Sequence, residues 1–403
     1  MPPQHYRYLA LLALTLAAST GARAEGADDL HLRASVGVVH DSNLFRLPDS
    51  ADTQALLGRS SAAETITVKT LGLNYNKAYS LQRLEFDASA NDYGYTNFSY
   101  LNFIAYNYNA AWRWSYTPRL HGNLTTARDQ SLNSFVDFTG FNQRNVRVSG
   151  NSRADATYEL DANWRLLGGL SQAKLSNSQQ LTQEPDFNST SADAGVRYVL
   201  PSGSSAAYTF KSTDGTYSTN RPIPSPGFYD NAFTQTDNDL LLTWAISSDT
   251  SVSVNAGYRS RKHPNYPQRD FSGMTGGANL NWSISPKSAI VAGWTRDLGT
   301  YETSISNFTQ TDRFSVGPVW QVSPKATVRL NLDYTIRDFR GTPQGPVAVP
   351  RRDTSRDTSL SFGWQPVTYL VLNASLQNAR RWSNLPGLDF TSNMINLTAQ
   401  FTY

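Results

Sequence analysis

The segment Val328-Arg329-Leu330-Asn331-Leu332-Asp333-Tyr334-Thr335-Ile336-Arg337 decides the fold of this chain. Apolar and polar side chains alternate along it, and successive side chains of a β-strand point to opposite faces of the sheet. One face would carry Val328, Leu330, Leu332, Tyr334 and Ile336, and the other Arg329, Asn331, Asp333, Thr335 and Arg337. A strand with one apolar face and one polar, partly charged face separates an apolar medium from water.

The same alternation recurs along the rest of the chain, in runs of roughly ten or more residues that exceed the usual length of globular strands. Clear examples are residues 252–259, 370–377 and 395–403. Beyond the N-terminal leader we find no segment with helical periodicity. These runs predict an all-β protein made of long strands.

Short turn signals separate alternate runs, and long polar connections separate the others. The short turns are expected at Lys77 to Ser80, Thr117 to Arg119, Asp161 to Asn163, Pro201 to Gly203, Ser247 to Thr250, Ser285 to Lys287, Ser323 to Lys325 and Gln365 to Val367. These eight turns join nine hairpins, which gives about 18 strands with both termini on the short-turn side. The long connections include Asp41 to Ala63, Thr216 to Gln235 and Phe339 to Arg356, and the first two are candidates for a plug or constriction.

Short turns at one rim and long loops at the other are typical of an antiparallel transmembrane β-barrel of the bacterial outer membrane, with periplasmic turns and extracellular loops. Seven of the nine tryptophans lie within about five residues of a predicted short turn: Trp112, Trp114, Trp164, Trp244, Trp282, Trp320 and Trp364. Indole rings gathered at one rim form an aromatic girdle, whereas core tryptophans would be scattered along the strands. A β-propeller has a similar repeat length but needs four strands where two long runs already fill the span.

The first residues read MPPQHYRYLALLALTLAASTGARA, with a basic Arg7, an apolar stretch and the small-x-small sequence Ala22-Arg23-Ala24. We predict a signal peptide, residues 1–24, which is cleaved near Ala24 and leaves residues 25–403 as a single barrel domain. The 379 residues that remain carry 33 basic and 32 acidic side chains, so the bulk charge indicates no partner. The mean hydropathy of −0.45 and the lack of a second long apolar run exclude a helical membrane protein.

The sequence offers little for catalysis. It has no cysteine, which excludes disulfides and thiol chemistry, and His31, His40, His121 and His263 lack metal-ligand spacing. Nucleophile elbows, phosphate-binding glycine loops and nucleic-acid motifs are absent. Glu85 and Asp87 share one polar strand face, where acid/base catalysis is conceivable, but they fit better as lumen residues opposite arginines. We predict no enzymatic activity, no cofactor, no metal and no nucleic-acid partner.

A barrel of this size is wide enough for a water-filled lumen, which the polar strand faces would line. The expected lumen-lining residues are charged and lie on three predicted strands: Arg83, Glu85, Asp87, Arg259, Arg329, Asp333 and Arg337. The interior is therefore predicted to be a hydrophilic conduit unless a loop closes it.

Basic residues also gather near the predicted outer loops of the C-terminal half, as an extracellular basic collar of Arg261, Lys262, Arg351, Arg352, Arg380 and Arg381. Such a collar would attract and orient an acidic polysaccharide by charge and by guanidinium hydrogen bonds. It would equally well meet the phosphates of outer-membrane lipid and lipopolysaccharide. The sequence leaves both interpretations open.

The first predicted loop reads His40-Asp41-Ser42-Asn43-Leu44-Phe45-Arg46-Leu47-Pro48-Asp49. Placed after a signal peptide and a first strand, this element resembles the EpsL family, the exosortase B-associated extracellular polysaccharide biosynthesis transporters of Gram-negative bacteria. Asp41 and Asn43 are expected to form a turn that caps the first strand, and Leu44 and Phe45 to anchor the loop against the wall. The C-terminal Phe401-Thr402-Tyr403 is similar to the aromatic terminal signature of outer-membrane barrels.

The resemblance implies a part in exopolysaccharide biosynthesis or export, with the barrel as a conduit for the polymer and periplasmic polysaccharide-export proteins as partners. Two other functions fit the same barrel. One is a closed barrel whose outer loops bind polysaccharide at the cell surface, as a lectin does. The other is a general diffusion porin for small solutes.

The register of residues 328–337 can be tested directly. Leu330→Arg, which places a charge toward lipid, should impair assembly by about 2 to 4 kcal/mol near the bilayer midplane. Arg329→Glu should instead change the ion selectivity measured in planar bilayers. The reverse pattern would mean that the register is shifted by one residue and that every inward assignment inverts.

Overall fold

The computed structural model describes residues 29–137, 142–179, 186–222, 229–301, 306–341 and 349–403. For residues 219–222 and 229–231 it describes the backbone only. Its 18 strands are β1 (Leu30–Asp41), β2 (Glu64–Tyr79), β3 (Gln82–Tyr95), β4 (Phe103–Thr117), β5 (Leu120–Leu132), β6 (Val146–Glu159), β7 (Trp164–Asn177), β8 (Phe187–Val199), β9 (Ser205–Pro222), β10 (Tyr229–Ala245), β11 (Thr250–Lys262), β12 (Phe271–Ser285), β13 (Ser288–Thr300), β14 (Phe308–Ser323), β15 (Ala326–Arg340), β16 (Arg352–Val367), β17 (Leu370–Ser383) and β18 (Phe390–Thr402). The predicted leader lies outside the described residues.

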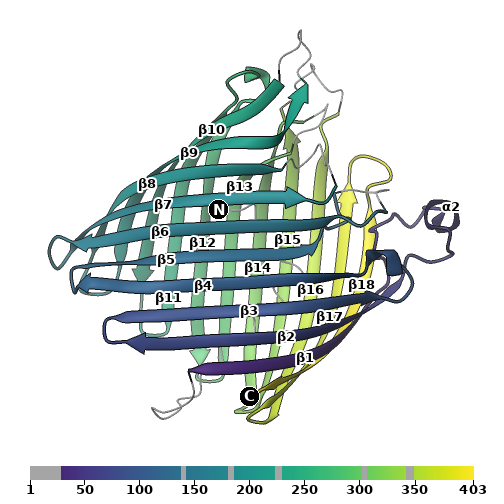
Figure 1. Cartoon of the computed structure of the whole chain (residues 1–403), viewed down its shortest axis with the longest axis horizontal. Helices are drawn as coiled ribbons and strands as arrows, with labels where there is room; N and C mark the ends of the chain where they lie inside the picture. The colour runs from purple at the N-terminus through teal and green to yellow at the C-terminus, as the bar shows by residue number, and fades with distance from the viewer. Residues whose placement is uncertain (1–28, 138–141, 180–185, 223–228, 302–305, 342–348) are drawn as a thin grey trace.

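The strands form one closed antiparallel barrel (Figure 1). Each strand pairs with its neighbours in the sequence, and β1 closes the ring by pairing with β18 from Arg33↔Thr402 to Asp41↔Met394. Closure leaves no strand with an unpaired edge, which is the condition for a β-sheet to lie in a membrane. The predicted fold class and strand number are confirmed.

The hairpin turns also follow the sequence. Each predicted short turn falls at or next to a tight connection between paired strands, for example between Ser323 of β14 and Ala326 of β15. Two are offset, since Gln365 to Val367 and most of Lys77 to Ser80 still belong to the ends of β16 and β2. In the turn after β6, the Asp161 carboxylate accepts hydrogen bonds from the backbone N–H groups of Asn163 and Trp164. These two bonds lower the pKa of Asp161, because they stabilise its charged form.

The prediction of a long loop from Thr216 to Gln235 is wrong. Pairing of β9 with β10 continues through Ala232↔Thr216 and reaches Tyr229↔Pro222 after an irregularity in the register. Most of this segment is therefore an extension of the hairpin, and β-forming threonine and tyrosine residues explain why it stays extended. The first loop contains a five-residue helix, α2 (Thr53–Leu57), capped by the Asp52 side chain. A helix this short shows no detectable periodicity.

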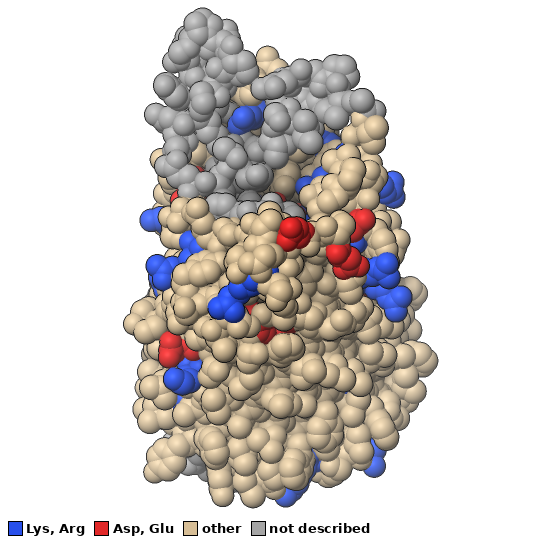
Figure 2. All heavy atoms as spheres, turned by 90° about the vertical axis from the view of Figure 1, so that its right-hand side faces the viewer, with Lys and Arg blue, Asp and Glu red and all other residues tan. Residues whose placement is uncertain are grey.

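One face of the barrel wall is apolar and points outward. Leu360 of β16 lies between Leu330 of β15 and Leu376 of β17, and Leu360 and Leu376 are 47% and 55% exposed. Near the short turns, the exposed side chains include six tryptophans, Trp112, Trp164, Trp244, Trp282, Trp320 and Trp364. On the side drawn in Figure 2, charged residues lie mainly in the upper and middle part, and the lower part is largely uncharged. This distribution fits an apolar band with an aromatic girdle at one interface.

One apolar cluster lies inside the barrel, near the long-loop rim. We name three loops L1 (residues 42–63), L2 (96–102, including the 3-10 turn Ser99–Leu101) and L3 (133–145). The Phe45 ring of L1 lies 4.8 Å from the Phe98 ring of L2 and 4.7 Å from the Phe135 ring of L3. Phe45 therefore joins the three loops in a core that also contains Leu44, Leu47 and Leu101.

Polar contacts at the end of β1 direct Phe45 into this core. The buried Asp41 carboxylate accepts hydrogen bonds from the Asn43 backbone N–H and the Ser392 hydroxyl and pairs with Arg46 at 2.8 Å. The Asn43 side chain bonds both L1, at Leu47, and the β18 backbone, at Thr391. The turn and anchoring roles predicted for Asp41, Asn43 and Phe45 are confirmed.

Glu64, the first residue of β2, holds L2 in place. Its carboxylate is completely buried and accepts hydrogen bonds from the backbone N–H groups of Thr65, Thr96, Asn97 and Phe98 at 2.6 to 3.1 Å. These bonds satisfy the charge that burial would otherwise penalise. Glu64 therefore fixes the turn that places Phe98 in the loop core.

Glu64→Gln should destabilise the barrel by about 1–3 kcal/mol, because an amide NH2 replaces an acceptor that faces N–H donors. The free energy of unfolding can be measured by urea titration in detergent, followed by tryptophan fluorescence. Glu85→Gln, at a partly exposed carboxylate, is the matched control and should cost less than about 1 kcal/mol. Equal losses in the two variants would contradict the role given to Glu64.

Candidate functional site

L3 leaves the wall after β5 and contacts the opposite side of the barrel. The Asp137 carboxylate of L3 lies 2.7 Å from the Arg337 guanidinium of β15, and the Val136 carbonyl accepts a hydrogen bond from Arg381 of β17. β6, which follows L3, is nine strands away from β15 in either direction around the ring. The contact therefore spans the lumen, and it shows that Arg337 and Arg381 face inward.

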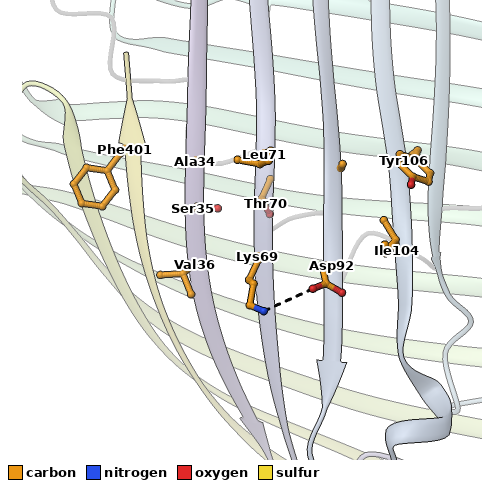
Figure 3. A pocket seen from close by; sticks show the side chains of 11 residues that line it. Ala34, Ser35, Val36, Lys69, Thr70, Leu71, Asp92, Ile104, Tyr106 and Phe401 are labelled. Carbon is orange, nitrogen blue, oxygen red and sulfur yellow. Dashed lines mark ion pairs between the residues drawn. The ribbon is translucent and has the colours of Figure 1, made fainter.

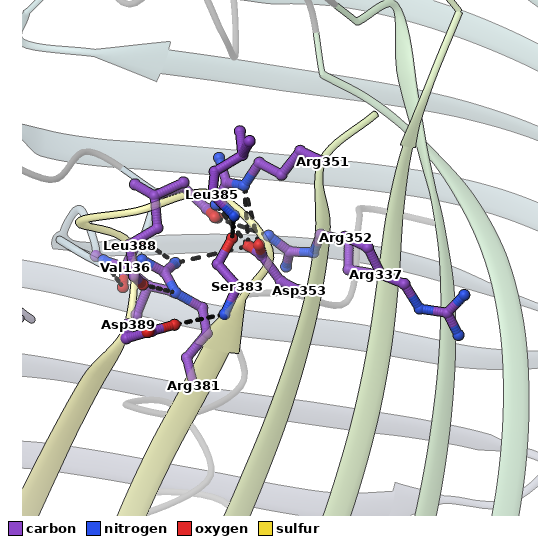
Figure 4. Close-up of polar contacts among 12 residues, drawn as sticks. Val136, Arg337, Arg351, Arg352, Asp353, Arg381, Ser383, Leu385, Leu388 and Asp389 are labelled. Atoms are coloured by element: carbon purple, nitrogen blue, oxygen red, sulfur yellow. Dashed lines mark hydrogen bonds and ion pairs between the residues drawn. The ribbon is translucent and has the colours of Figure 1, made fainter. Parts of the chain in front are cut away.

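The wall that receives L3 is a compact cluster of charged groups (Figure 4). Arg351 pairs with Asp353 at 2.5 Å, and Arg381 lies 4.0 Å from the same carboxylate and bonds the Leu388 carbonyl. The five side chains of the cluster, Arg337, Arg351, Arg381, Asp137 and Asp353, are at most 15% exposed. We call this set, three guanidinium groups and two carboxylates, the L3 constriction.

Toward the short turns the lumen is more open. Arg83 and Arg113 flank Glu85 on the inward face, and their side chains are 50% and 55% exposed. Asn331, whose side chain bonds Ser359 on the same face, is also exposed. Inward-facing side chains keep such exposure only where water fills the space beside them. Among the described residues, the lumen is therefore more crowded at L3 than near the short turns.

The seven residues expected to line the lumen all lie on the inward strand face. Six of them lie in ion pairs with other inward residues or with L3, namely Arg83–Glu85, Asp87–Arg33, Arg259 with Asp237 and Asp297, Asp333–Arg313 and Arg337–Asp137. The Glu85 carboxylate also accepts hydrogen bonds from both Nε and Nη2 of Arg113. Within the part of the chain that the structure describes, Arg329 has no ion-pair partner.

The predicted extracellular basic collar is not one surface. Arg261, Arg351 and Arg381 face the interior, where Arg261 bonds Gln235 and Thr300 and lies 4.0 Å from the Phe233 ring. Lys262, Arg352 and Arg380 lie on the outward face, where Arg352 approaches Asp338 and Arg380 stacks on Trp382. The prediction grouped neighbours in sequence, but neighbouring residues of a strand point to opposite sides of the wall.

The sequence analysis missed Asp137 and Asp353 of the constriction. Asp137 stands in a loop with no motif, and Asp353 lies at a strand end, so neither carboxylate is conspicuous. A usable signal was the group of apolar residues Phe135, Val136, Phe138 and Phe141 around Asp137 in the sequence, because apolar loop residues tend to pack inward. Among the described residues, L3 crosses the lumen. Of the two predicted plug candidates, the segment 41–63 contributes Phe45 to the loop core, and residues 216–222 and 229–235 continue the β9–β10 hairpin.

A groove of about 570 Å³ runs over the outside of the wall across β18, β1, β2, β3 and β4 (Figure 3). Its residues, including Val36, Leu71, Ile104 and Phe401, belong to the outward face. It contains the exposed Lys69–Asp92 pair, whose charged atoms are 3.8 Å apart. None of the residues that line the groove belongs to the L3 constriction.

Among the described residues, no group of three or more His, Asp or Glu side chains could hold a metal ion. No helix of the described ranges is long and apolar enough to cross a membrane.

Residues 245–403 match the family model of putative beta-barrel porin 2. No curated protein matches the chain. The outer membrane protein OpdK from Pseudomonas aeruginosa is similar in structure, with a TM-score of 0.52 and 12% identity over 93% of this chain and 99% of that chain. A BenF-like porin from Pseudomonas fluorescens Pf-5 has a TM-score of 0.53 and 11% identity, with 93% and 99% covered.

A third similar structure is Pseudomonas aeruginosa OccK2 (OpdF) in complex with glucuronate, with a TM-score of 0.51, 11% identity, and 93% and 96% of the two chains covered. At these identities the likeness concerns the fold alone. Together with the closed barrel of 18 strands, these findings define the protein as a porin-like β-barrel of the outer-membrane type. The comparisons do not confirm the resemblance to the EpsL family.

The position of L3 can be checked by cross-linking, because the chain has no cysteine of its own. Asp137→Cys combined with Arg337→Cys should react with a short bifunctional maleimide and give an internal cross-link, detected by mass spectrometry after proteolysis. Asp137→Cys with Arg329→Cys is the control, since Arg329 lies on the same strand face but about 26 Å further along it. Cross-linking of the control pair alone would show that L3 lies deeper in the lumen.

Proposed function

We propose that the protein is a passive diffusion channel for small hydrophilic solutes, with L3 setting the size limit. The observation that carries this proposal is the contact of Asp137 with Arg337 across the lumen. A loop bonded to the opposite wall divides the cross-section of the barrel and leaves less room than the ring of strands encloses. The exposed inward residues on the periplasmic side support a water-filled path below it.

The charge of the constriction favours anionic solutes. It holds three guanidinium groups and two carboxylates, and an Arg guanidinium matches a carboxylate with two parallel hydrogen bonds. Among the similar structures, OpdK is described with vanillate and OccK2 (OpdF) with glucuronate, both of which are small organic carboxylates. We therefore propose small carboxylates as the preferred solutes.

The conduit for exopolysaccharide, which the EpsL resemblance implies, is the second candidate. The contacts of L3 with Arg337 and Arg381 obstruct such a conduit, so we expect L3 to leave these residues during export. Exopolysaccharide and periplasmic export proteins stay predictions of the sequence. A surface polysaccharide-binding barrel would depend on the outer loops and would need no open lumen.

Planar-bilayer recordings test the proposed function. Asp137→Ala and Arg337→Ala should each raise single-channel conductance and admit larger solutes, because each removes one anchor of L3. The two variants should differ in selectivity: loss of Arg337 should lower the preference for anions and loss of Asp137 should raise it. A unit charge at about 4 Å is worth about 1 kcal/mol even in a water-like dielectric.

Arg329→Ala is the control for these recordings, since it removes an inward arginine remote from L3 and should leave the size limit unchanged. A wild-type protein that conducts no ions but binds exopolysaccharide would refute the channel and support the surface-binding function. Polymer that blocks the wild-type channel from the periplasmic side only, and passes when Asp137 is replaced, would favour export.

A further inference from the structure

Two arginines face each other directly on the outer surface of the barrel. In the pairing of β16 with β17, Arg356 lies opposite Arg380, in the same row as the outward pairs Leu360↔Leu376 and Thr354↔Trp382. Both arginines are exposed. Directly opposed side chains of neighbouring strands have Cβ atoms about 5 Å apart, and two like charges at this spacing destabilise the sheet.

The surroundings do not neutralise this pair. Within the described residues, neither Arg356 nor Arg380 has an ion-pair partner, and Arg380 instead stacks on the Trp382 ring at 4.6 Å. On the same face, Asp338 lies within 3.4 Å of Arg340 and 3.6 Å of Arg352. The carboxylate of Asp389, which precedes β18, accepts a hydrogen bond from the Ser383 backbone N–H. The outward face of β15, β16 and β17 thus carries four arginines and one aspartate at its outer end.

The position of the two arginines along the barrel axis indicates which part of the membrane they face. Trp364 marks the periplasmic girdle on β16, and Arg356 stands eight residues further along the same strand. At about 3.3 Å per residue and a tilt of about 40°, this separation is about 20 Å along the barrel axis. The apolar band of an outer-membrane barrel is about 25 Å tall, so the two guanidinium groups stand near its outer edge, where lipid headgroups lie.

We propose that Arg356 and Arg380 form a binding site for a phosphate group of an outer-leaflet lipid, with one phosphate held between the two guanidinium groups. Arg presents a planar fork of donors that matches phosphate oxygens. A doubly charged anion between the arginines converts their repulsion into two attractive contacts. Tyr334, which lies opposite Arg356 on β15, and Trp382 flank the site with amphipathic rings suited to the interface. The site is separate from the L3 constriction and does not depend on the channel function.

Native mass spectrometry of the detergent-purified full-length protein tests this site, with lipid A that carries its phosphates as probe. Wild type should retain the phosphorylated lipid and should not retain the same lipid after enzymatic dephosphorylation. Arg356→Gln with Arg380→Gln should weaken retention by at least about tenfold, the effect of losing one charge-assisted hydrogen bond. Arg296→Gln is the matched control, because Arg296 is also outward-facing but paired with Asp312 at 2.8 Å.

Arg356→Glu provides a second, independent readout. This variant creates a cross-strand pair with Arg380, so it should resist urea better than wild type in lipid-free neutral detergent while losing the phosphorylated lipid. Undiminished lipid retention in either variant, or equal loss in the Arg296 control, would overturn the proposal. Calorimetric binding of inorganic phosphate as tight as that of the lipid would show that free phosphate, not lipid, is the ligand.

Discussion

The structure depends on one constraint, that every backbone N–H and C=O group in the membrane must be paired within the protein. A sheet of 18 strands meets it because β1 pairs with β18 along nine consecutive residues, which removes both open edges. Closure also gives the wall an inside and an outside. Because side chains alternate along each strand, every strand must present apolar groups to lipid and polar groups to water, as residues 328–337 do.

The interior of a ring this wide cannot be filled by strand side chains alone, and the loops occupy it near the outer rim. L1, L2 and L3 meet at Phe45, whose ring contacts Phe98 and Phe135. Buried carboxylates hold the loops in position, Asp41 through L1 and β18 and Glu64 through the backbone of L2. This core supports L3 on one side, and the pair of Asp137 with Arg337 holds it on the other. The size of the passage thus rests on contacts between loops that are remote in sequence.

The same alternation places the two side chains of single dipeptides on opposite sides of the wall. Arg381 faces the lumen and bonds L3, whereas Arg380 faces outward and stacks on Trp382. Arg351 and Arg352 divide in the same way, toward Asp353 inside and toward Asp338 outside. Charge that is concentrated in the sequence is therefore distributed between the L3 constriction and the outer surface of the barrel.

The sequence by itself determined the barrel, its strand number, the sites of the eight short turns and the inward side of the seven expected lumen residues, because these follow from local alternation and turn chemistry. It also placed Asp41, Asn43 and Phe45 in an anchoring turn. The tertiary structure alone decided which loop enters the lumen: the segment 216–235 continues a hairpin, and Asp137 reaches a residue 200 positions away. It likewise decided that Arg356 opposes Arg380. The residues in these contacts come together only when the ring closes. No local sequence pattern therefore indicates them.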